Sequence, residues 1–255
     1  MRIAVISDLH LGIRDRADRF GHCPEAFGRF LDHLEAHHER IIIGGDLYET
    51  WQGARYGRIR EALQAIQRAY PRLTTRLREP PYELIYGNHD AVLANEGIPR
   101  EIEVRDNGLT LLFTHGHRWD PLLKRTTPVA YSFSWSTGWL IRGDDPVRRT
   151  VSQWRERFER RFLYNVAPKR ELADARDANC PYQRGALKLL EEVPELNVIV
   201  CGHTHVPVHC RTPYGDYLNS GAVAGGHLVW VSIDTQTRSW ELMTHDTPFT
   251  PAETP

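Results

Sequence analysis

Hydrophobic residues in the first part of the chain alternate between short continuous runs and helical faces. The runs span Arg2–Ile6, Arg40–Ile43 and Tyr82–Tyr86, and each ends in a polar cluster. The helical faces are formed by Phe27, Phe30, Leu31 and Leu34, within a helix from about Pro24 to His38, and by Ile59, Leu63 and Ile66. This order of strand, helix, strand, helix and strand predicts a parallel sheet covered by helices.

The later hydrophobic runs alternate with turn residues and are typical of strands. They span Glu101–Arg105, Leu109–Thr114, Leu196–Cys201, Val206–Thr212, Asp216–Leu218, Leu228–Ile233 and Ser239–Thr244. The turns Asp106-Asn107-Gly108 and Pro213-Tyr214-Gly215 are typical of hairpins. We therefore expect an α/β fold in which two sheets pack face to face as a β-sandwich flanked by helices.

The strand pattern stops between Trp119 and Tyr182. Within this segment, one face of an amphipathic helix is predicted by Val147, Val151, Trp154, Phe158 and Phe162. Basic residues outnumber acidic ones between Arg118 and Glu171. We expect residues 119–182 to form a helical cap inserted into a core of residues 1–118 and 183–246, with a flexible tail at residues 247–255.

The composition bounds the function classes. The 255 residues are 41% hydrophobic and 25% charged, which excludes a disordered chain. The formal net charge of -1 gives no global basic surface, so we do not expect nucleic acid as a partner. No run approaches the ~20 apolar residues of a transmembrane helix. Cys23, Cys180, Cys201 and Cys210 form no CxxC pair, and we expect free thiols in a cytoplasmic protein.

Five polar clusters lie where predicted strands end. They are Asp8-Leu9-His10, Gly45-Asp46, Gly87-Asn88-His89-Asp90, His115-Gly116-His117 and His203-Thr204-His205. Each has another explanation when taken alone: Asp8 could cap a helix, and Gly45 and Gly87 could be turn glycines. Together they predict a metal site, because ligands collect at the carboxyl ends of strands in open α/β sheets. Carboxylate and imidazole without thiolate suit Mn, Fe, Zn or Co.

These clusters resemble the signature of the calcineurin-like metallophosphoesterases. The family pattern DxH, GDxx(D/E), GN(H/R)(D/E), HG(H/D), GHxH occurs here in order, with Gly45-Asp46-Leu47-Tyr48-Glu49 as its second motif. Asn219-Ser220-Gly221 is similar to the Asn-x-Gly that follows GHxH in the family. The resemblance implies the metallophosphoesterase fold and a centre of two divalent transition-metal ions, with Mn preferred and Fe, Zn, Co or Ni as alternatives.

The resemblance also implies a role for each residue of the site. Asp8, His10 and His205 would bind the first metal, Asn88, His115 and His203 the second, and Asp46 both. A hydroxide bridging the metals would then attack the phosphorus of a phosphodiester, phosphomonoester or pyrophosphate. His89 would stabilise charge or donate a proton, and Asp90 would hold the His89 ring. For His117, a supporting or structural role stays open beside a direct one.

Within the family, the segments Ser7–Gly12 and Gly45–Trp51 look most like UDP-2,3-diacylglucosamine hydrolases, which cut a pyrophosphate in a lipid-linked nucleotide sugar. Those enzymes typically have Arg in place of His89 and HGD in place of His115-Gly116-His117. A soluble phosphate ester therefore stands beside the lipid substrate. A nuclease is a remote alternative. A non-catalytic scaffold is also remote, because all seven ligand positions hold residues that can bind a metal.

The predicted cap contains an uncharged stretch rich in aromatic residues, from Thr126 to Ile141. It would pack the cap onto the core or onto a partner subunit. Alternatively it would form a lid beside the metals, next to a basic helix with Arg148, Arg149, Arg155 and Arg157, and would suit an amphiphilic substrate. Peripheral membrane contact and a homo-oligomer stay open.

Overall fold

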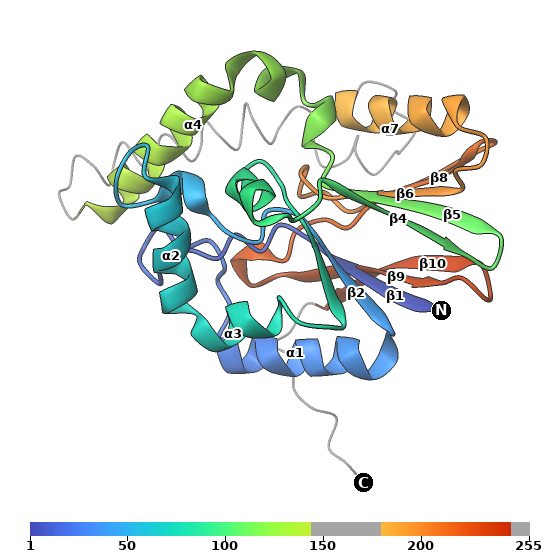
Figure 1. The fold of residues 1–255 in the computed structure, drawn as a ribbon, viewed down its shortest axis with the longest axis horizontal. Coiled ribbons are helices and arrows are strands. Elements are labelled where there is room, and N and C mark those ends of the chain that lie inside the picture. The colour runs from blue at the N-terminus through green and yellow to red at the C-terminus, as the bar shows by residue number, and fades with distance from the viewer. Residues whose placement is uncertain (144–179, 246–255) are drawn as a thin grey trace, which may run out of the picture.

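The structure is a computed structural model of the chain, and it describes residues 1–143 and 180–245. The first of its two five-stranded sheets has the strand order β10-β9-β1-β2-β3 (Figure 1). Its strands are β1 (Arg2–Ile6), β2 (Arg40–Gly44), β3 (Tyr82–Ile85), β9 (Leu228–Asp234) and β10 (Ser239–His245). The first three run parallel to one another, whereas β9 is antiparallel to β1 and to β10. The predicted parallel sheet is therefore extended by an antiparallel hairpin from the end of the chain.

The second sheet has the order β4-β5-β6-β8-β7. Its strands are β4 (Glu101–Asp106), β5 (Leu109–Thr114), β6 (Val198–Cys201), β7 (Val208–Thr212) and β8 (Gly215–Asn219). The hairpins β4–β5 and β7–β8 are antiparallel, while β5, β6 and β8 run parallel. The carboxyl ends of β5 and β6 consequently lie at one edge of this sheet.

The two sheets pack face to face because their strands bury both faces. In β1, Ile3 and Val5 point between the sheets, where they meet Phe113 of β5 and Val200 of β6. Ala4 and Ile6, at the alternate positions, face the helices instead. This period of two gives each sheet one face toward its partner and one toward a helical layer.

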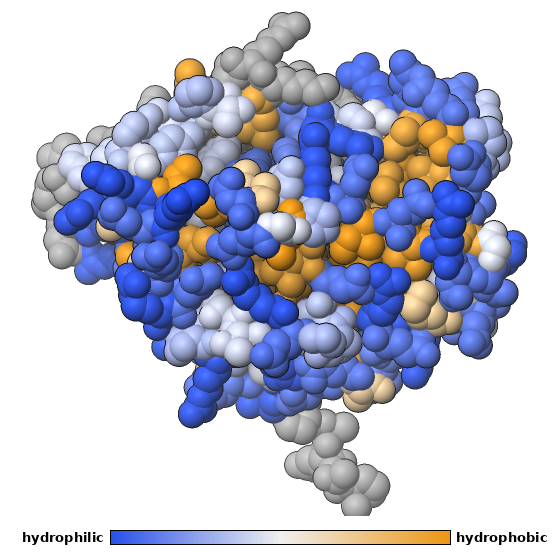
Figure 2. All heavy atoms as spheres, in the orientation of Figure 1, coloured by the Kyte–Doolittle hydropathy of each residue, from blue (hydrophilic) through white to orange (hydrophobic). Residues whose placement is uncertain are grey.

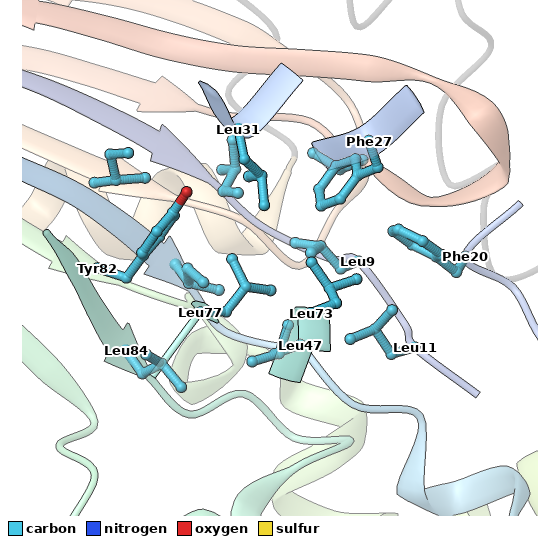
Figure 3. Packing of buried hydrophobic residues seen from close by; sticks show 14 of the residues in the cluster. Leu9, Leu11, Phe20, Phe27, Leu31, Leu47, Leu73, Leu77, Tyr82 and Leu84 are labelled. Carbon is cyan, nitrogen blue, oxygen red and sulfur yellow. The ribbon is translucent and has the colours of Figure 1, made fainter. Parts of the chain in front are cut away.

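Helices cover the outer faces of the sandwich (Figure 1). On the first sheet lie α1 (Pro24–His37), α2 (Ile59–Ala69) and α3 (Pro71–Arg76), and on the second lies α7 (Pro181–Glu192). Figure 3 shows Phe27 and Leu31 of α1 pointing toward Leu9 and Leu73. These residues form one apolar layer, and the full burial of such a side chain contributes about 1.5–3 kcal/mol.

The sequence pattern predicted all ten strands, with each end within two residues of its observed position. It did not predict α3, which begins because Pro71 has no N–H for a continuing helix but is well suited to a first helical turn. It also placed the start of β6 at Leu196. The N–H of Leu196 instead donates to the carbonyl of Val193, which closes a turn before Val198.

The segment after Trp119 begins with a long helix, α4 (Pro121–Arg142). It packs on a short 3-10 helix, η1 (Thr50–Gln52). Gly138 approaches so closely that a Cβ there would lie 2.9 Å from Cβ of Gln52, and Arg142 bonds to the Gln52 carbonyl at 2.6 Å. Part of the uncharged stretch thus contacts the core, while its Val129 and Trp139 are exposed.

Several expectations concern residues that lie outside the described ranges. These are the amphipathic helix of residues 147–162, the arginines at 148, 149, 155 and 157, and the tail at 247–255. The division into a core and an inserted cap therefore stays a prediction. None of the four cysteines, all of which lie in described segments, is in a disulfide.

In the view of Figure 2, hydrophilic residues cover most of the surface over α1, α2 and α3. Hydrophobic side chains reach the surface in a band between this layer and α7, where the strands lie in Figure 1. Among the helices that the structure describes, none has the length and apolar character needed to cross a membrane.

Candidate metal centre

The parallel strands of the two sheets deliver all five polar clusters to one place. Asp8 and His10 follow β1, Asp46 follows β2, Asn88 and His89 follow β3, His115 follows β5, and His203 and His205 follow β6. The loops after β1 and β2 are tied together, because the N–H groups of Asp8 and His10 donate to the carbonyls of Gly45 and Asp46, both at 3.0 Å. These two hydrogen bonds continue the parallel pairing past the ends of β1 and β2, and they hold the side chains of the two loops close to one another.

The backbone of these loops is bent into the left-handed region. The φ angles are 55° at Asp8, 48° at His10, 53° at Asp46, 70° at His203 and 59° at His205. Positive φ is uncommon for residues with a Cβ and costs of order 1–3 kcal/mol each. Such strain is concentrated at functional sites, where it aims side chains at a common point.

A first cluster is formed by Asp8, His10 and His205, whose ligand atoms lie within 4.8 Å of one another. Nε2 of His205 lies 3.1 Å from Oδ1 of Asp8 and 3.2 Å from Nε2 of His10. Among the described residues, no group makes a hydrogen bond of good geometry to that Asp8 oxygen. Burial disfavours the charged carboxylate, but His205 and His115 outweigh burial and lower the pKa of Asp8 to about 2. A buried, charged oxygen facing two imidazoles fits a cation.

A second cluster is formed by Asp46, His115 and His203. His115 donates Nδ1–H to the carbonyl of Gly44 at 2.9 Å, so in the neutral ring Nε2 carries the lone pair. That nitrogen faces two oxygens, Oδ2 of Asp46 at 3.1 Å and Oδ1 of Asn88 at 3.2 Å. Burial opposes a charge there, yet Asp46 and Asp8 raise the pKa of His115 to about 10. The arrangement therefore calls for a positive species between these atoms, either a proton or a metal ion.

Asp46 lies between the two clusters. Its Oδ2 is 3.1 Å from His115 of the second cluster and 3.9 Å from Nε2 of His10 in the first. Burial disfavours its charge, but His115 and His89 outweigh burial and hold the pKa of Asp46 well below its usual range. A permanently charged carboxylate within reach of both clusters is suited to two cations at once.

Glycines allow the carboxylate and imidazole to approach the backbone. A Cβ at Gly87 would lie 2.1 Å from Oδ1 of Asp46, and a Cβ at Gly45 would lie 2.6 Å from Nδ1 of His115. Gly45 also has a φ of 95°. Both positions therefore lack space for a side chain, which is a stronger reason for glycine than an ordinary turn.

His89 lies beside the first cluster and is held by a residue to which the sequence analysis gave no role. Its Nδ1 donates to Oε1 of Glu49 at 2.7 Å, and Oε2 of the same carboxylate accepts from Nδ1 of His10 at 3.0 Å. Trp51 stacks on the His89 ring with centroids 4.4 Å apart. Glu49 ends the second motif of the family pattern, which was the available signal for it.

The prediction that Asp90 holds the His89 ring is wrong, because the Asp90 carboxylate has other partners. Oδ1 of Asp90 accepts from the N–H of Gly87 at 2.7 Å, and Oδ2 accepts from the N–H of Tyr48 at 3.2 Å. The side chain therefore turns back onto its own loop, because those backbone groups are buried and need an acceptor. Burial and the nearby Asp46 charge raise the pKa of Asp90 to about 7.

His117 lies in η3 (His117–Trp119), with its ring centroid 5.5 Å from that of His115. Its buried Nδ1 has no hydrogen-bond partner among the described residues, and burial together with His115 lowers the pKa of His117 to about 3. A neutral imidazole beside the second cluster is compatible with each of the roles left open for it.

Comparison with known proteins shows which proteins this chain resembles. The sequence model of the calcineurin-like phosphoesterase family matches residues 1–207. A UDP-2,3-diacylglucosamine hydrolase of Shewanella loihica is 28% identical over 86% of this chain and 89% of that protein. Among solved structures, an archaeal phosphodiesterase is 14% identical with a TM-score of 0.45, over 96% of this chain and 100% of that one. The E. coli phosphoesterase Yfce is 15% identical with a TM-score of 0.41, over 95% and 98%.

The family match includes every polar cluster of the centre, from Asp8 to His205. The donor groups of these clusters are imidazoles and carboxylates, as they are in a third group formed by His10, Glu49 and His89, and the Asn88 amide faces His115. Such groups suit divalent transition metals. This chain therefore belongs to the calcineurin-like phosphoesterase family and is a metal-dependent phosphoesterase.

Proposed function

We propose that the protein hydrolyses a phosphodiester, phosphomonoester or pyrophosphate bond with two divalent metal ions. The observation that carries this proposal is the position of Asp46 between two largely buried donor clusters. Asp8, His10 and His205 would hold the first ion, and Asn88, His115 and His203 the second, with Asp46 shared. When bound, the two ions would polarise the phosphoryl group and activate water near neutral pH.

His89 is the side chain that would assist the metal ions in the reaction. With Nδ1 fixed by Glu49, its Nε2 is the atom left to act on substrate. A hydrogen bond from Nε2 to a phosphoryl oxygen, or a proton passed to the departing oxygen, would stabilise the charge that grows during phosphorus–oxygen cleavage. The stacked Trp51 ring limits rotation of the imidazole and shields one of its faces from water.

The test begins with protein freed of metal by a chelator and reloaded with Mn²⁺. We expect about two ions per chain and hydrolysis of at least one of bis-p-nitrophenyl phosphate, p-nitrophenyl phosphate and nucleotides. Metal-free protein should be inactive and should recover on reloading. Binding of fewer than two ions, or no hydrolysis of these esters or of UDP-diacylglucosamine by loaded protein, would refute the proposal.

A second candidate substrate is a lipid-linked nucleotide sugar with a pyrophosphate. The hydrolase of Shewanella loihica favours it, since the match covers most of both chains. A second support is a run of aromatic contacts from His89 to α4. Trp51 stacks on His89 and meets Tyr131, while Tyr56 packs against Tyr131 and Trp135. Such an apolar surface beside a phosphoryl site suits acyl chains.

Trp135→Ala distinguishes the two substrate classes. On the lipid interpretation, its KM for UDP-diacylglucosamine should rise about tenfold, while kinetics with a small diester should stay within twofold. Tyr214→Ala is the matched control, because this exposed aromatic side chain lies in the β7–β8 turn. Equal behaviour of Trp135→Ala toward both substrates would favour the soluble phosphate ester.

A further inference from the structure

We propose that Asp120 is a positioning residue that sets the tautomer and orientation of His203. The proposal rests on the function proposed above, in which His203 binds the second metal. Asp120 belongs to none of the recognised motifs and lies between η3 and α4. It is nevertheless buried, with 6% of its surface exposed.

Both oxygens of Asp120 have defined partners. Oδ2 lies 3.1 Å from Nε2 of His203, and Oδ1 accepts from the N–H of Leu123 in the first turn of α4 at 3.1 Å. Since a carboxylate can only accept, the His203 nitrogen facing it carries the hydrogen. The lone pair of the imidazole is therefore on Nδ1, which is the nitrogen left for a metal.

The His203 ring is fixed from two sides. Its own backbone N–H donates to Oδ2 of Asp8 at 3.0 Å, while its Nε2 is held by Asp120. Between these anchors, His203 shares the second cluster with Asp46 and His115. Histidines that bind metals usually donate their other N–H to a carboxylate or carbonyl, which orients the ring and makes it a better ligand.

The same carboxylate joins the two ends of the segment that enters through α4 and returns through α7. The Tyr182 hydroxyl of α7 faces Asp120, and the Tyr182 ring meets that of His203 edge to face, with centroids 5.2 Å apart. At Gly185 a Cβ would lie 2.2 Å from Trp119, so α7 and η3 are in close contact. Asp120 thus lies at the junction of η3, α4, α7 and the second donor cluster.

Asp120→Asn tests the proposal with little change in shape. Asn caps helices as well as Asp does, so the amide oxygen can keep the Leu123 hydrogen bond. The amide nitrogen then faces Nε2 of His203, and two donors repel unless the imidazole changes tautomer. The hydrogen would move to Nδ1 and block the metal. We expect one of two Mn²⁺ sites to weaken by about 10–100-fold in calorimetric titration of metal-free protein, with the other site unchanged.

A second measurement needs no metal. Long-range nitrogen–proton NMR spectra of metal-free protein should show His203 as the Nε2–H tautomer in wild type and as Nδ1–H in Asp120→Asn. Loss of the signal in His203→Gln would assign it. Tyr182→Phe, which keeps the carboxylate, should retain the wild-type tautomer with a smaller loss of Mn²⁺ affinity.

Asp216→Asn is the matched control. Asp216 also faces a histidine, with Oδ2 3.6 Å from Nε2 of His209, but on the β7–β8 hairpin away from both donor clusters. The Asp216→Asn variant should bind both ions as wild type does.

If wild type binds two ions and Asp120→Asn matches it in affinity and tautomer, the positioning role is overturned. If wild type itself fails to bind two ions, the proposed function is at fault instead. If Asp120→Asn does not fold, two other measurements test the positioning role. An Nε2–H tautomer of His203 in wild type and a lowered Mn²⁺ affinity of Tyr182→Phe would support it, and the absence of both would overturn it.

Discussion

The carboxylate of Glu49 accepts the Nδ1 hydrogen of His89 at 2.7 Å, and this bond fixes which ring nitrogen can meet a substrate. Burial disfavours a protonated imidazole, but the charges of Glu49 and Asp46 outweigh burial and raise the pKa of His89 to about 8. Burial also opposes charge on Glu49, yet His89 and His10 hold the pKa of Glu49 far below its usual range. The pair is thus a buried carboxylate and a partly exposed imidazole, each of which supports the charged form of the other.

Glu49→Gln should lower kcat by about 10–100-fold, because an amide cannot hold both imidazoles as a charged carboxylate does. The first metal should also bind more weakly, since Glu49 accepts from Nδ1 of His10. Steady-state kinetics at several Mn²⁺ concentrations measure both effects. Glu83→Gln, which removes an ion pair with Arg40 on the first sheet, is the control and should keep normal kcat. A kcat within twofold of wild type in Glu49→Gln would contradict this role.

His89→Ala should keep both metal ions and lose about 10²–10⁴-fold in kcat, because it removes a group that acts on developing charge. If His89 donates a proton, the loss should be smaller for esters with a good leaving group such as p-nitrophenol. Metal analysis and a leaving-group series check both statements. A fall in metal content would instead identify His89 as a ligand.

Asp46→Asn should weaken both metal sites and remove most activity. A neutral amide leaves no negative charge between two cations, and the amide nitrogen cannot bind a metal. Elemental analysis after dialysis measures the number of bound ions. Near-normal turnover together with two bound ions would contradict the shared role of Asp46.

Gly87→Ala should weaken metal binding without changing any ligand, because its Cβ would lie 2.1 Å from Oδ1 of Asp46 and displace that carboxylate. Gly28→Ala is the control, since a Cβ there meets only the end of the Arg76 side chain at 4.0 Å and replaces glycine within a helix. Titration with Mn²⁺ should therefore separate the two variants. Equal Mn²⁺ affinities would show that the loop adapts.

His38 should make the fold less stable in mild acid. Burial lowers the pKa of His38 below its ordinary value of 6.5, while the ring bonds to the Leu34 carbonyl at 3.0 Å and to Ser232 at 2.9 Å. The unfolded chain then takes up the proton more readily, so this contribution is complete above about pH 6.5 and is lost as the pH falls below it. Thermal unfolding of metal-free protein should give a larger drop in Tm between pH 7.5 and 5.5 for wild type than for His38→Gln. Equal drops would show that His38 does not contribute.

The elements of the fold could be predicted from the sequence because their signals are local. In β1, the apolar run from Arg2 to Ile6 marks a strand buried on both faces, and the order of strands and helices predicts the parallel pairing of β1, β2 and β3. The boundary between α2 and α3 was missed because the hydrophobic period continues past it, while the backbone changes at Pro71. The pairing of β9 with β1 depends on contacts more than 200 residues apart in sequence, for which the chain carries no local mark.

The sequence by itself also determined the residue types of the centre, since Asp8, Asp46 and His115 each follow a strand in a recognisable motif. Only the tertiary structure decided the hydrogen bonds around them. Asp90, next to His89 in sequence, turns to the buried N–H groups of Gly87 and Tyr48. Glu49 holds His89 from another loop, and Asp120 reaches His203 from 83 residues away. A motif determines which side chains follow the end of a strand. The hydrogen-bond partner of each side chain depends instead on which buried donors and acceptors the packed sheets bring within about 3 Å.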